Sequence, residues 1–447
     1  MTAIQTRADP ETSSLDSHTK YALCVLMLSC SLSFLDRQVV NILAEPIKKE
    51  FGLSDTELGI LTGMAFALFH AALTLPMARI ADRANRVLVI AGSMTVWSLA
   101  TAASGLAAGF GQLLAARMFV GVGEAGGIAP AHALIADTVP KRKRATAIAF
   151  YSAGIPLGGL LGLALGGLVL DSYGWRAAFF VASTPGLVLA PLMLLTIGDP
   201  ARSRLLPSAR EAFPPLGDAF REIFSKKAFL LVTAAGAAMT FVNFGQAAFL
   251  ASFFFRVHGE ALASMASGVN GLVGTALGAA GLLGLALGCA KGLAGMIGSF
   301  AGGWLTDRLD GDGYRAYALV PALIAIVRIP LFTAALLVPD TAAAFTLMAI
   351  HFLVGGMGKI GGFAAVQGLV TPRVRATAAA VYGIGINLVG LGLGPLCVGL
   401  SSDSLSAAGL GAAEGLRWTL VATSAPLLIV ALLNWHASRH LSAESVS

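Results

Sequence analysis

The chain has 447 residues, of which 56% are hydrophobic and 12% are charged, and it carries a formal net charge of +6. Soluble domains average about 25% charged residues, so this composition leaves too little polar surface to coat a water-soluble globule. Glycine is frequent, at 53 residues, and in lipid it allows helices to approach closely. The composition excludes an ordinary soluble domain and indicates many packed membrane helices. Basic loops account for the net charge, and we expect no nucleic-acid partner.

Apolar stretches of roughly 20 residues, the length of a bilayer-spanning helix, follow one another along the chain. The polar residues 1–20 lack the order of a cleaved signal and are predicted to form a tail. The first six spans, in a bundle over 21–198, are placed at 21–43, 57–80, 87–108, 112–136, 145–170 and 177–198. A polar linker is predicted over 199–227. The second six, in a bundle over 228–438, are placed at 228–256, 284–306, 315–338, 342–367, 376–402 and 416–437, before a tail over 439–447.

An extra apolar, glycine-rich stretch, 264–283, precedes the eighth span. A full crossing there would move every later basic loop to the other side of the membrane. We therefore expect a helical extension, a re-entrant turn or a segment on the outer surface.

The distribution of lysine and arginine predicts the orientation, because basic residues concentrate in cytoplasmic loops. With both termini inside, 20 basic residues are cytoplasmic, 5 are outside and 5 lie within spans. The sequence therefore predicts a multi-pass protein of the cell (inner) membrane with both termini in the cytoplasm.

An internal repeat relates the two bundles. The stretch Arg144-Ala-Thr-Ala-Ile-Ala-Phe-Tyr151 is echoed by Arg375-Ala-Thr-Ala-Ala-Ala-Val-Tyr382, and Gly121-Val-Gly-Glu124-Ala-Gly-Gly127 by Gly356-Met-Gly-Lys359-Ile-Gly-Gly362. Two parallel halves with a site at their interface are typical of facilitator transporters. The predicted fold is an all-α membrane protein of the major facilitator type, with 12 transmembrane helices in two pseudo-symmetric six-helix bundles.

The loop after the second span reads Ala78-Arg-Ile-Ala-Asp82-Arg83-Ala-Asn-Arg86. It resembles the major facilitator signature Gly-x-x-x-Asp-Arg-x-Gly-Arg, with Ala78 and Asn85 in place of the usual glycines. Asp307-Arg308 repeats its core after the eighth span. An acid at a helix end can pair with bases on a neighbouring helix, so we predict a gating role for Asp82, Arg83, Arg86, Asp307 and Arg308; the alternative is solvated loop charges.

Charges inside spans are costly and usually face a cavity where they have a role. Arg117 and Glu124 are seven residues apart and share one face of the fourth span. Asp36 lies at a depth similar to that of Arg117, so Asp36–Arg117 is the expected direct pair, with Glu124 deeper. We predict that Asp36, Glu124 and Arg117 couple transport to protons; the alternative is a permanent ion pair that only fixes helix packing.

Other polar residues within spans are candidates for a substrate cavity. Arg37 either faces a neighbouring helix or lines the cavity, and Lys359 occupies the repeat position of Glu124, where it could hold an anionic head group or pair with Glu124. Arg328 in the ninth span has no partner that the sequence identifies. The remaining candidate cavity residues are Tyr151, Asn243, Gln246, Tyr382 and Asn387.

Several motifs are similar to those of the Spinster family. They are Phe34-Leu-Asp36-Arg37-Gln38, Ile47-Lys-Lys-Glu-Phe-Gly-Leu-Ser-Asp55-Thr-Glu-Leu-Gly59, Arg117-Met-Phe-Val-Gly-Val-Gly-Glu124-Ala-Gly and Gly174-Trp-Arg176. The resemblance covers nearly all of the first half and the motif loops of the second, while 264–283 departs from the usual family length. It implies a lipid transporter, because Spinster proteins export sphingosine 1-phosphate or move lysophospholipids, some with proton coupling. By resemblance, Asp36, Arg117 and Glu124 match the family's acidic and basic transport residues.

The first hypothesis is therefore a proton-coupled transporter of an amphipathic lipid, acting by alternating access as a monomer, with protons as the coupling ion and no cofactor or metal. The second is a transporter of a small organic anion or drug. Gly154-Ile-Pro156-Leu-Gly158-Gly159 resembles an antiporter-type motif and hints at exchange. A membrane enzyme is the third, but no HExxH, GxSxG or Walker-type motif is present, so no catalytic residues are expected.

Overall fold

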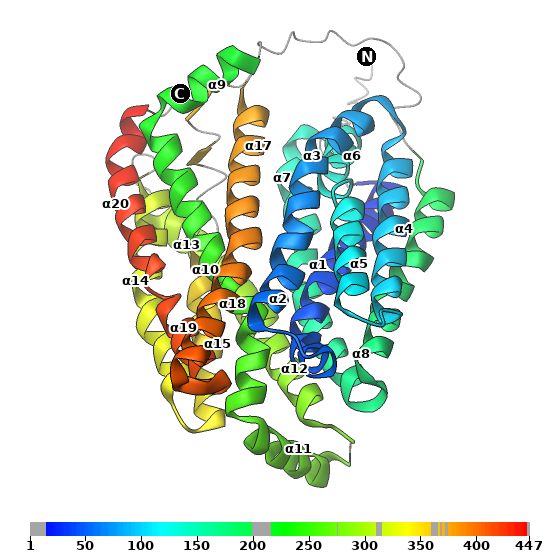
Figure 1. The fold of residues 1–447 in the computed structure, drawn as a ribbon. Coiled ribbons are helices and arrows are strands. Elements are labelled where there is room, and N and C mark those ends of the chain that lie inside the picture. Colours follow the sequence, from blue (N-terminus) through cyan, green and yellow to red (C-terminus); the bar gives the residue numbers. More distant parts are fainter. Residues whose placement is uncertain are drawn as a thin grey trace, which may run out of the picture.

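The computed structural model describes residues 15–198, 216–274, 276–309, 315–358, 365–366, 369–371 and 374–444, excluding the side chains of a few helical residues such as Asp82 and Arg375. The chain folds as helices packed side by side in two groups (Figure 1). Candidate membrane spans, judged by length and composition, include Lys141–Thr196 and Thr377–His440, each long enough for two crossings, and a shorter apolar helix covers Thr341–Met357. The fold agrees with the predicted two bundles of six spans.

The first half consists of α1 to α8. Its helices are α1 (Ser17–Phe51), α2 (Asp55–Gly59), η1 (Ile60–Met64), α3 (Ala65–Arg83), α4 (Arg86–Gly105), α5 (Phe110–Glu124), α6 (Ile128–Thr138), η2 (Lys141–Lys143), α7 (Arg144–Ser152) and α8 (Gly154–Thr196). Helix α8 holds two spans, because Gly174 has φ +80° and lets the chain reverse there. A residue with a Cβ adopts that conformation only with strain.

The second half begins after α9 (Leu216–Ser225), a short helix in the predicted linker. Its helices are α10 (Lys227–Val257), α11 (Gly259–Val273), α12 (Ala279–Cys289), η4 (Ala290–Ala294), α13 (Gly295–Leu309), α14 (Ala316–Leu337), α15 (Thr341–Met357), α17 (Arg375–Ile386), η5 (Asn387–Leu393), α18 (Gly394–Leu405), η6 (Ser406–Leu410), α19 (Gly411–Ala422) and α20 (Pro426–Glu444). A second reversal falls at Gly409 and Gly411, which also have positive φ.

The extra segment before the eighth span is divided between two helices. Its first half, 264–273, lies in α11, a separate helix at one end of the molecule, while its last residues form the start of α12 (Figure 1). The eighth span therefore begins five residues earlier than predicted, at Ala279. Of the three expected arrangements, a surface helix fits best. We call this the α11 end of the molecule and the opposite one the α9 end.

Glycines bring helices into backbone contact, as the composition predicted. Gly154, Gly158 and Gly162 recur every four residues on one face of α8, against α1. A Cβ at these positions would lie 2.5, 2.1 and 2.5 Å from carbonyl oxygens of α1. Small residues spaced in this way allow membrane helices to pack closely. Helix α1 is thereby held in place, which positions the charged residues at its centre.

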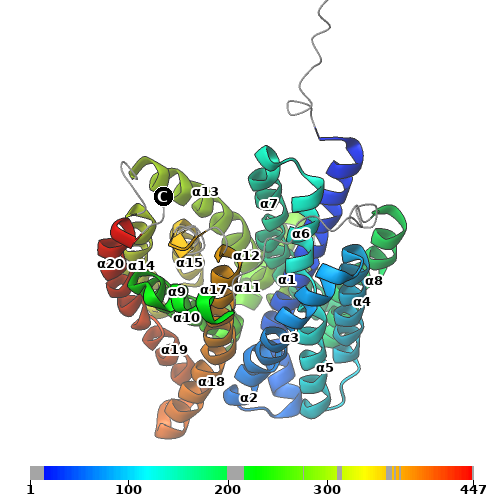
Figure 2. The ribbon, with the colours of Figure 1, turned by 90° about the horizontal axis from the view of Figure 1, so that it is seen from above.

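The two halves meet along α1 with α10, α2 with α18, α3 with η5, and α8 with α12. Seen from above, the halves lie side by side with α1 and α12 between them (Figure 2). Gly167 of α8 and Gly284 of α12 approach the opposite helix so closely that a Cβ would lie 2.2 Å from its backbone oxygen. The interface therefore contains both close backbone packing and the polar groups described below.

Candidate functional site

A buried ion pair joins α1 to α5 near the middle of the first half. Arg117 Nη1 donates to Asp36 Oδ2 at 2.9 Å, and Thr101 of α4 donates to Asp36 Oδ1 at 2.5 Å. Both charged residues are 2% exposed. The structure thus forms the pair that the similar depths of Asp36 and Arg117 predicted, and it satisfies both oxygens of Asp36.

A second buried pair lies beside the first and was not predicted. Arg37 Nε donates to Glu124 Oε2 at 2.6 Å, and Ser33 donates to the same oxygen at 2.7 Å. The other oxygen, Glu124 Oε1, is buried and has no hydrogen-bond partner among the described residues. A buried carboxylate oxygen without a donor is a position that a proton can occupy.

Aromatic rings hold the two arginines. The Arg37 guanidinium lies 4.9 Å from the ring centre of Phe34 and 4.6 Å from that of Phe66, and Arg117 lies 6.0 Å from the Phe66 ring. Contacts between a cation and a ring face are favourable when water is excluded. The Phe66 ring is therefore within cation–π reach of both guanidinium groups.

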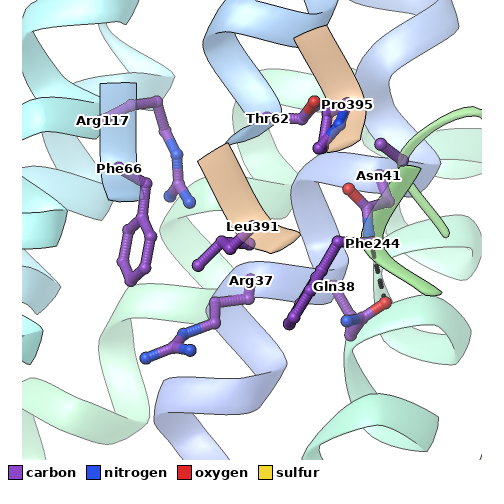
Figure 3. A pocket seen from close by; sticks show the side chains of 10 residues that line it. Arg37, Gln38, Asn41, Thr62, Phe66, Arg117, Phe244, Leu391 and Pro395 are labelled. Atoms are coloured by element: carbon purple, nitrogen blue, oxygen red, sulfur yellow. Dashed lines mark hydrogen bonds between the residues drawn. The ribbon is translucent and has the colours of Figure 1, made fainter. Parts of the chain in front are cut away.

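A pocket between the halves is bordered by these arginines (Figure 3). The first half lines it from α1, η1, α3 and α5, and the second half from α10, η5 and α18. Its residues are Arg37, Gln38, Asn41, Thr62, Phe66, Arg117, Phe244, Ala248, Leu391 and Pro395. Asp36 and Glu124 are not among them. The two arginines therefore line the pocket, and the carboxylates with which they pair do not.

Irregular helical turns form part of this pocket. Thr62 lies in η1 and Leu391 in η5, and both segments have the widened π-helical turn. Such turns are rare and occur frequently at functional sites. Next to the pocket, Lys291, in the similar segment η4, donates to Gln38 at 2.7 Å and so links the second half to α1.

A network of charges joins the halves at the α11 end. Arg256 of α10 forms ion pairs with Glu45 of α1 at 2.8 Å and with Asp55 of α2 at 2.7 Å. Its side chain is only 7% exposed. Asp55 also pairs with Lys48 and accepts from Ser402 of α18 at 2.6 Å. Among the described residues, the ion pairs between halves all lie at this end.

Two carboxylates at the same end each cap a helix of the opposite half. Asp403 of α18 accepts from the backbone N–H groups of Asp55 and Thr56, at 3.0 and 2.8 Å, at the start of α2. Asp171 of α8 accepts from those of Ala280 and Gly281, at 3.1 and 2.6 Å, at the start of α12. These first-turn N–H groups have no partner within their own helix, and a negative charge suits that end.

Sequence reasoning missed this α11-end network, which we define as Glu45, Lys48, Asp55, Asp171, Arg256 and Asp403. One signal was available, because Asp55 lies within a quoted Spinster-like motif and Arg256 is one of few basic residues on its predicted side. The network's contacts between the halves join residues about 110 to 350 positions apart.

The predicted gating residues lie at the α9 end. Arg86 pairs with Asp137 at the end of α6, a contact within the first half. Arg83, Asp307 and Arg308 are exposed, and Arg308 lies over the Trp304 ring at 5.1 Å. The side chain of Asp82 is outside the described residues. Gating by these residues stays a prediction.

The predicted cavity residues are dispersed. Arg37 lines the pocket, whereas Tyr151, Gln246 and Tyr382 do not line it and are buried, at 4, 4 and 6% exposure. Gln246 donates to Thr423, and Asn243 accepts from Arg328. Asn387 begins η5. Lys359 lies outside the described residues, so both roles expected for it, holding an anionic head group or pairing with Glu124, stay predictions.

Comparisons with known proteins agree on one family. The model of the Major Facilitator Superfamily matches residues 26–288. An MFS-type efflux pump of Mycolicibacterium smegmatis is 32% identical over 417 residues, which cover 93% of this chain and 92% of that protein. Protein spinster homolog 3 of Danio rerio is 26% identical and covers 89% of this chain and 80% of its own length.

A solved structure is similar over the whole length. It is the crystal structure of a bacterial homologue of the human lysosomal transporter Spinster, in an inward-facing and unoccupied conformation. The two chains superpose with a TM-score of 0.81 at 30% identity, covering 97% of this chain and 100% of the other. This likeness confirms the all-α major facilitator fold.

Proposed function

The chain belongs to the Major Facilitator Superfamily, whose members are secondary transporters, and from that premise we propose that it moves an amphipathic lipid by proton-coupled alternating access. The substrate class is a lipid with an anionic head group, such as a lysophospholipid or a sphingosine 1-phosphate-like molecule. The similarity to a Spinster structure at 30% identity over 97% of the chain supports a Spinster-type transporter.

The observation that carries the proton coupling is the environment of Glu124. One of its oxygens accepts from Arg37 and Ser33, while the other is buried without a partner. Protonation at Oε1 would remove the negative charge that now compensates Arg37. The guanidinium, which borders the pocket, would then be available to an anion. Proton binding at Glu124 and substrate binding at Arg37 are linked in this way.

Asp36 has a different role in this proposal. Both its oxygens accept hydrogen bonds, from Arg117 and Thr101. The donors occupy both oxygens of Asp36, whereas Glu124 Oε1 has no donor among the described residues. Glu124 therefore offers the open position for a proton, and Asp36 holds Arg117 beside the pocket.

Alternating access requires one end to close while the other opens. The α11-end network supplies contacts for a state that is closed at that end. The likeness to an inward-facing structure supports assigning the α9 end to the cytoplasm. The count of basic residues supports the same orientation, with both termini cytoplasmic in the inner membrane.

A small organic anion or drug is the second candidate substrate. The 32% identity to an efflux pump over nearly the full length favours it. The pocket, which presents two guanidinium groups and two amides, suits a carboxylate as well as a phosphate. Both candidates share an anionic group that the arginines recognise.

Uptake into proteoliposomes tests the proposal. The purified chain is reconstituted and offered a lysophospholipid, a sphingoid phosphate and a sugar acid, each with and without a pH gradient. We expect gradient-dependent uptake of one or both lipids. Uptake of the sugar acid alone would refute the lipid proposal, and gradient-independent uptake would refute proton coupling.

A further inference from the structure

A buried arginine in the second half has no acidic partner in the part of the chain that the structure describes. Arg328 lies near the middle of α14 and is 4% exposed. Arg37, Arg117 and Arg256 each pair with a carboxylate. No carboxylate among the described residues lies within ion-pair distance of Arg328. A charge within a membrane span is costly and ordinarily pairs with another group or marks a substrate path.

The hydrogen bonds of Arg328 all go to neutral acceptors. Its Nη2 donates to Asn243 Oδ1 of α10 at 2.9 Å and contacts His351 Nε2 of α15 at 3.1 Å, and its Nη1 contacts the Met239 sulfur at 3.2 Å. These contacts orient the guanidinium between two helices. They do not compensate its charge, which is buried without a counter-ion among the described residues.

The same place contains two donors without acceptors. A guanidinium group only donates, so His351 Nε2 is the acceptor and the ring hydrogen is on Nδ1. His351 Nδ1 and Arg328 Nε are both buried and have no partner among the described residues. Buried donors are rarely left unpaired in folded proteins. An anion would supply both the acceptors and the negative charge.

The repeat shows what is missing. Asn243 lies about as far from the end of α10 as Asp36 does from the end of α1. The alignment of Gly121 with Gly356 brings Arg117 next to the position of His351. The first half thus has an internal acid where the second has a neutral amide. No described residue supplies a negative charge to pair with Arg328.

The cluster lies close to the interface between the halves. Asn243 is followed in α10 by Phe244, which lines the pocket of Figure 3. Gly355 of α15 faces Arg328, and a Cβ there would lie 3.2 Å from Nε. Gly355 has no side chain, so no Cβ occupies the space beside Nε. The cluster is one residue along α10 from a residue that lines the pocket.

We propose that Arg328, His351 and Asn243 form an anion-binding site in the second half that takes the anionic head group of the substrate. The ligand class is a phosphate or carboxylate group, and Arg328 provides the charge. This inference rests on the proposed transport of an anionic amphiphile. Whether the anion belongs to a lipid or to a small solute is decided by the probes below.

The test measures binding to the purified full-length chain in detergent. The probes are oleoyl lysophosphatidylglycerol, monoolein as its counterpart without phosphate, and glucuronate as a small carboxylate. Arg328→Met removes the charge at similar side-chain length. Arg439→Met is the matched control, because Arg439 is an exposed arginine of α20 in the same half. The ligand-free unfolding temperature of each variant is measured alongside.

We expect Arg328→Met to weaken the binding of lysophosphatidylglycerol at least tenfold and to leave monoolein binding unchanged. Its ligand-free unfolding temperature should stay the same or rise, because an uncompensated buried charge is removed. Arg439→Met should change neither the binding of lysophosphatidylglycerol nor the ligand-free unfolding temperature. The proposal would be overturned if Arg328→Met bound lysophosphatidylglycerol and glucuronate as tightly as the unchanged protein does. It would also be overturned if the substitution weakened the binding of monoolein as much as that of lysophosphatidylglycerol.

Asn243→Asp provides a second test that does not require Arg328 to be removed. A carboxylate at this position would form an ion pair with Arg328 in place of the present hydrogen bond from Nη2 to the amide oxygen. We expect a higher ligand-free unfolding temperature and at least tenfold weaker binding of the anionic lipid. If Asn243→Asp bound the anionic lipid as tightly as the unchanged protein does, the proposed anion-binding site would be contradicted.

The outcomes separate this inference from the proposed function. Proton-coupled lipid uptake that survives in both variants would leave the proposed function standing and refute the site. Binding of glucuronate alone, lost in Arg328→Met, would support the site and refute the lipid substrate.

Discussion

Asp171 and Asp403 occupy equivalent places in the two halves and cap helices in opposite directions across the interface. Asp171 follows the fifth span and binds the start of α12, while Asp403 follows the eleventh span and binds the start of α2. The internal repeat thus produces a reciprocal pair of contacts at the α11 end. Together with Arg256 they join the two halves at this end, and the following predictions test how much each contact contributes.

Replacing Arg256 with Met should open the α11 end. The substitution leaves Glu45 and Asp55 buried without their cation, and breaking a buried pair costs about 3–5 kcal/mol. At about 3 kcal/mol the ratio of closed to open molecules should fall about 100-fold, since each 1.4 kcal/mol is a factor of ten.

Distances between spin labels at the exposed Lys49 and Ser404, with the four cysteines replaced, would measure the change. Arg417→Met is the control, because Arg417 pairs with Glu414 within one half; an equal change there would contradict the prediction.

Replacing Asp403 with Ala should have a smaller effect in the same direction. The change removes the acceptor for two N–H groups of α2, and loss of a helix cap costs about 0.5–2 kcal/mol. We expect a shift toward the open state of about 2- to 30-fold, since each 1.4 kcal/mol is a factor of ten, measured with the same spin labels. Asp171→Ala should match it, and a shift confined to one of the two variants would argue against reciprocal caps.

Replacing Glu124 with Gln should abolish proton-dependent uptake while the protein stays folded. Glutamine can still accept from Ser33 and Arg37 but cannot take up a proton. We expect the stimulation of uptake by a pH gradient to fall at least tenfold in proteoliposomes. Asp36→Asn is the companion variant, expected to lower uptake by releasing Arg117. Gradient-driven uptake that persists in Glu124→Gln would rule out Glu124 as the proton carrier.

Replacing Gly158 with Ala should destabilise the first half. A Cβ there would lie 2.1 Å from the Ser31 carbonyl oxygen, so α1 and α8 must separate. Overpacking of this kind costs about 1–3 kcal/mol. Gly159→Ala is a matched control, since a Cβ at Gly159 meets nothing within 4 Å. The unfolding temperature in detergent should fall in the first variant only, and equal behaviour of the two would contradict the packing argument.

The stability of the protein should fall below neutral pH because of His258, which lies between α10 and α11. Burial lowers the pKa of His258, and its Nδ1 contacts the Thr341 hydroxyl at 3.0 Å. The unfolded chain therefore binds a proton near the ordinary value of about 6.5, while the folded chain does so only at lower pH. Stability that is present above about pH 6.5 is lost as the pH decreases. Unfolding temperatures between pH 7.5 and 5 should decline less steeply in His258→Asn, and an identical slope would exclude this histidine.

Much of the architecture could be predicted from local patterns. Apolar runs of membrane-spanning length predicted the two six-span bundles, because lipid requires every span to satisfy its own backbone. The seven-residue spacing of Arg117 and Glu124 placed both on one helix face, and similar depths predicted the Asp36–Arg117 pair. These features depend only on the spacing of residues and the length of apolar runs. Both can be read from the sequence without knowing how the helices pack.

The partners across helices and across the halves depended on the tertiary structure. The pairing of Arg37 with Glu124, of Arg256 with Asp55, and the contacts of Arg328 join residues on helices whose rotation and offset no local pattern specifies. Side-chain charges can select among many partners, and helix packing decides which are within reach. The sequence by itself determined that this chain crosses a membrane many times and carries buried charges in two related halves. Only the tertiary structure decided that the first half neutralises its central arginines with its own acids, whereas the second half leaves Arg328 without one among its described residues.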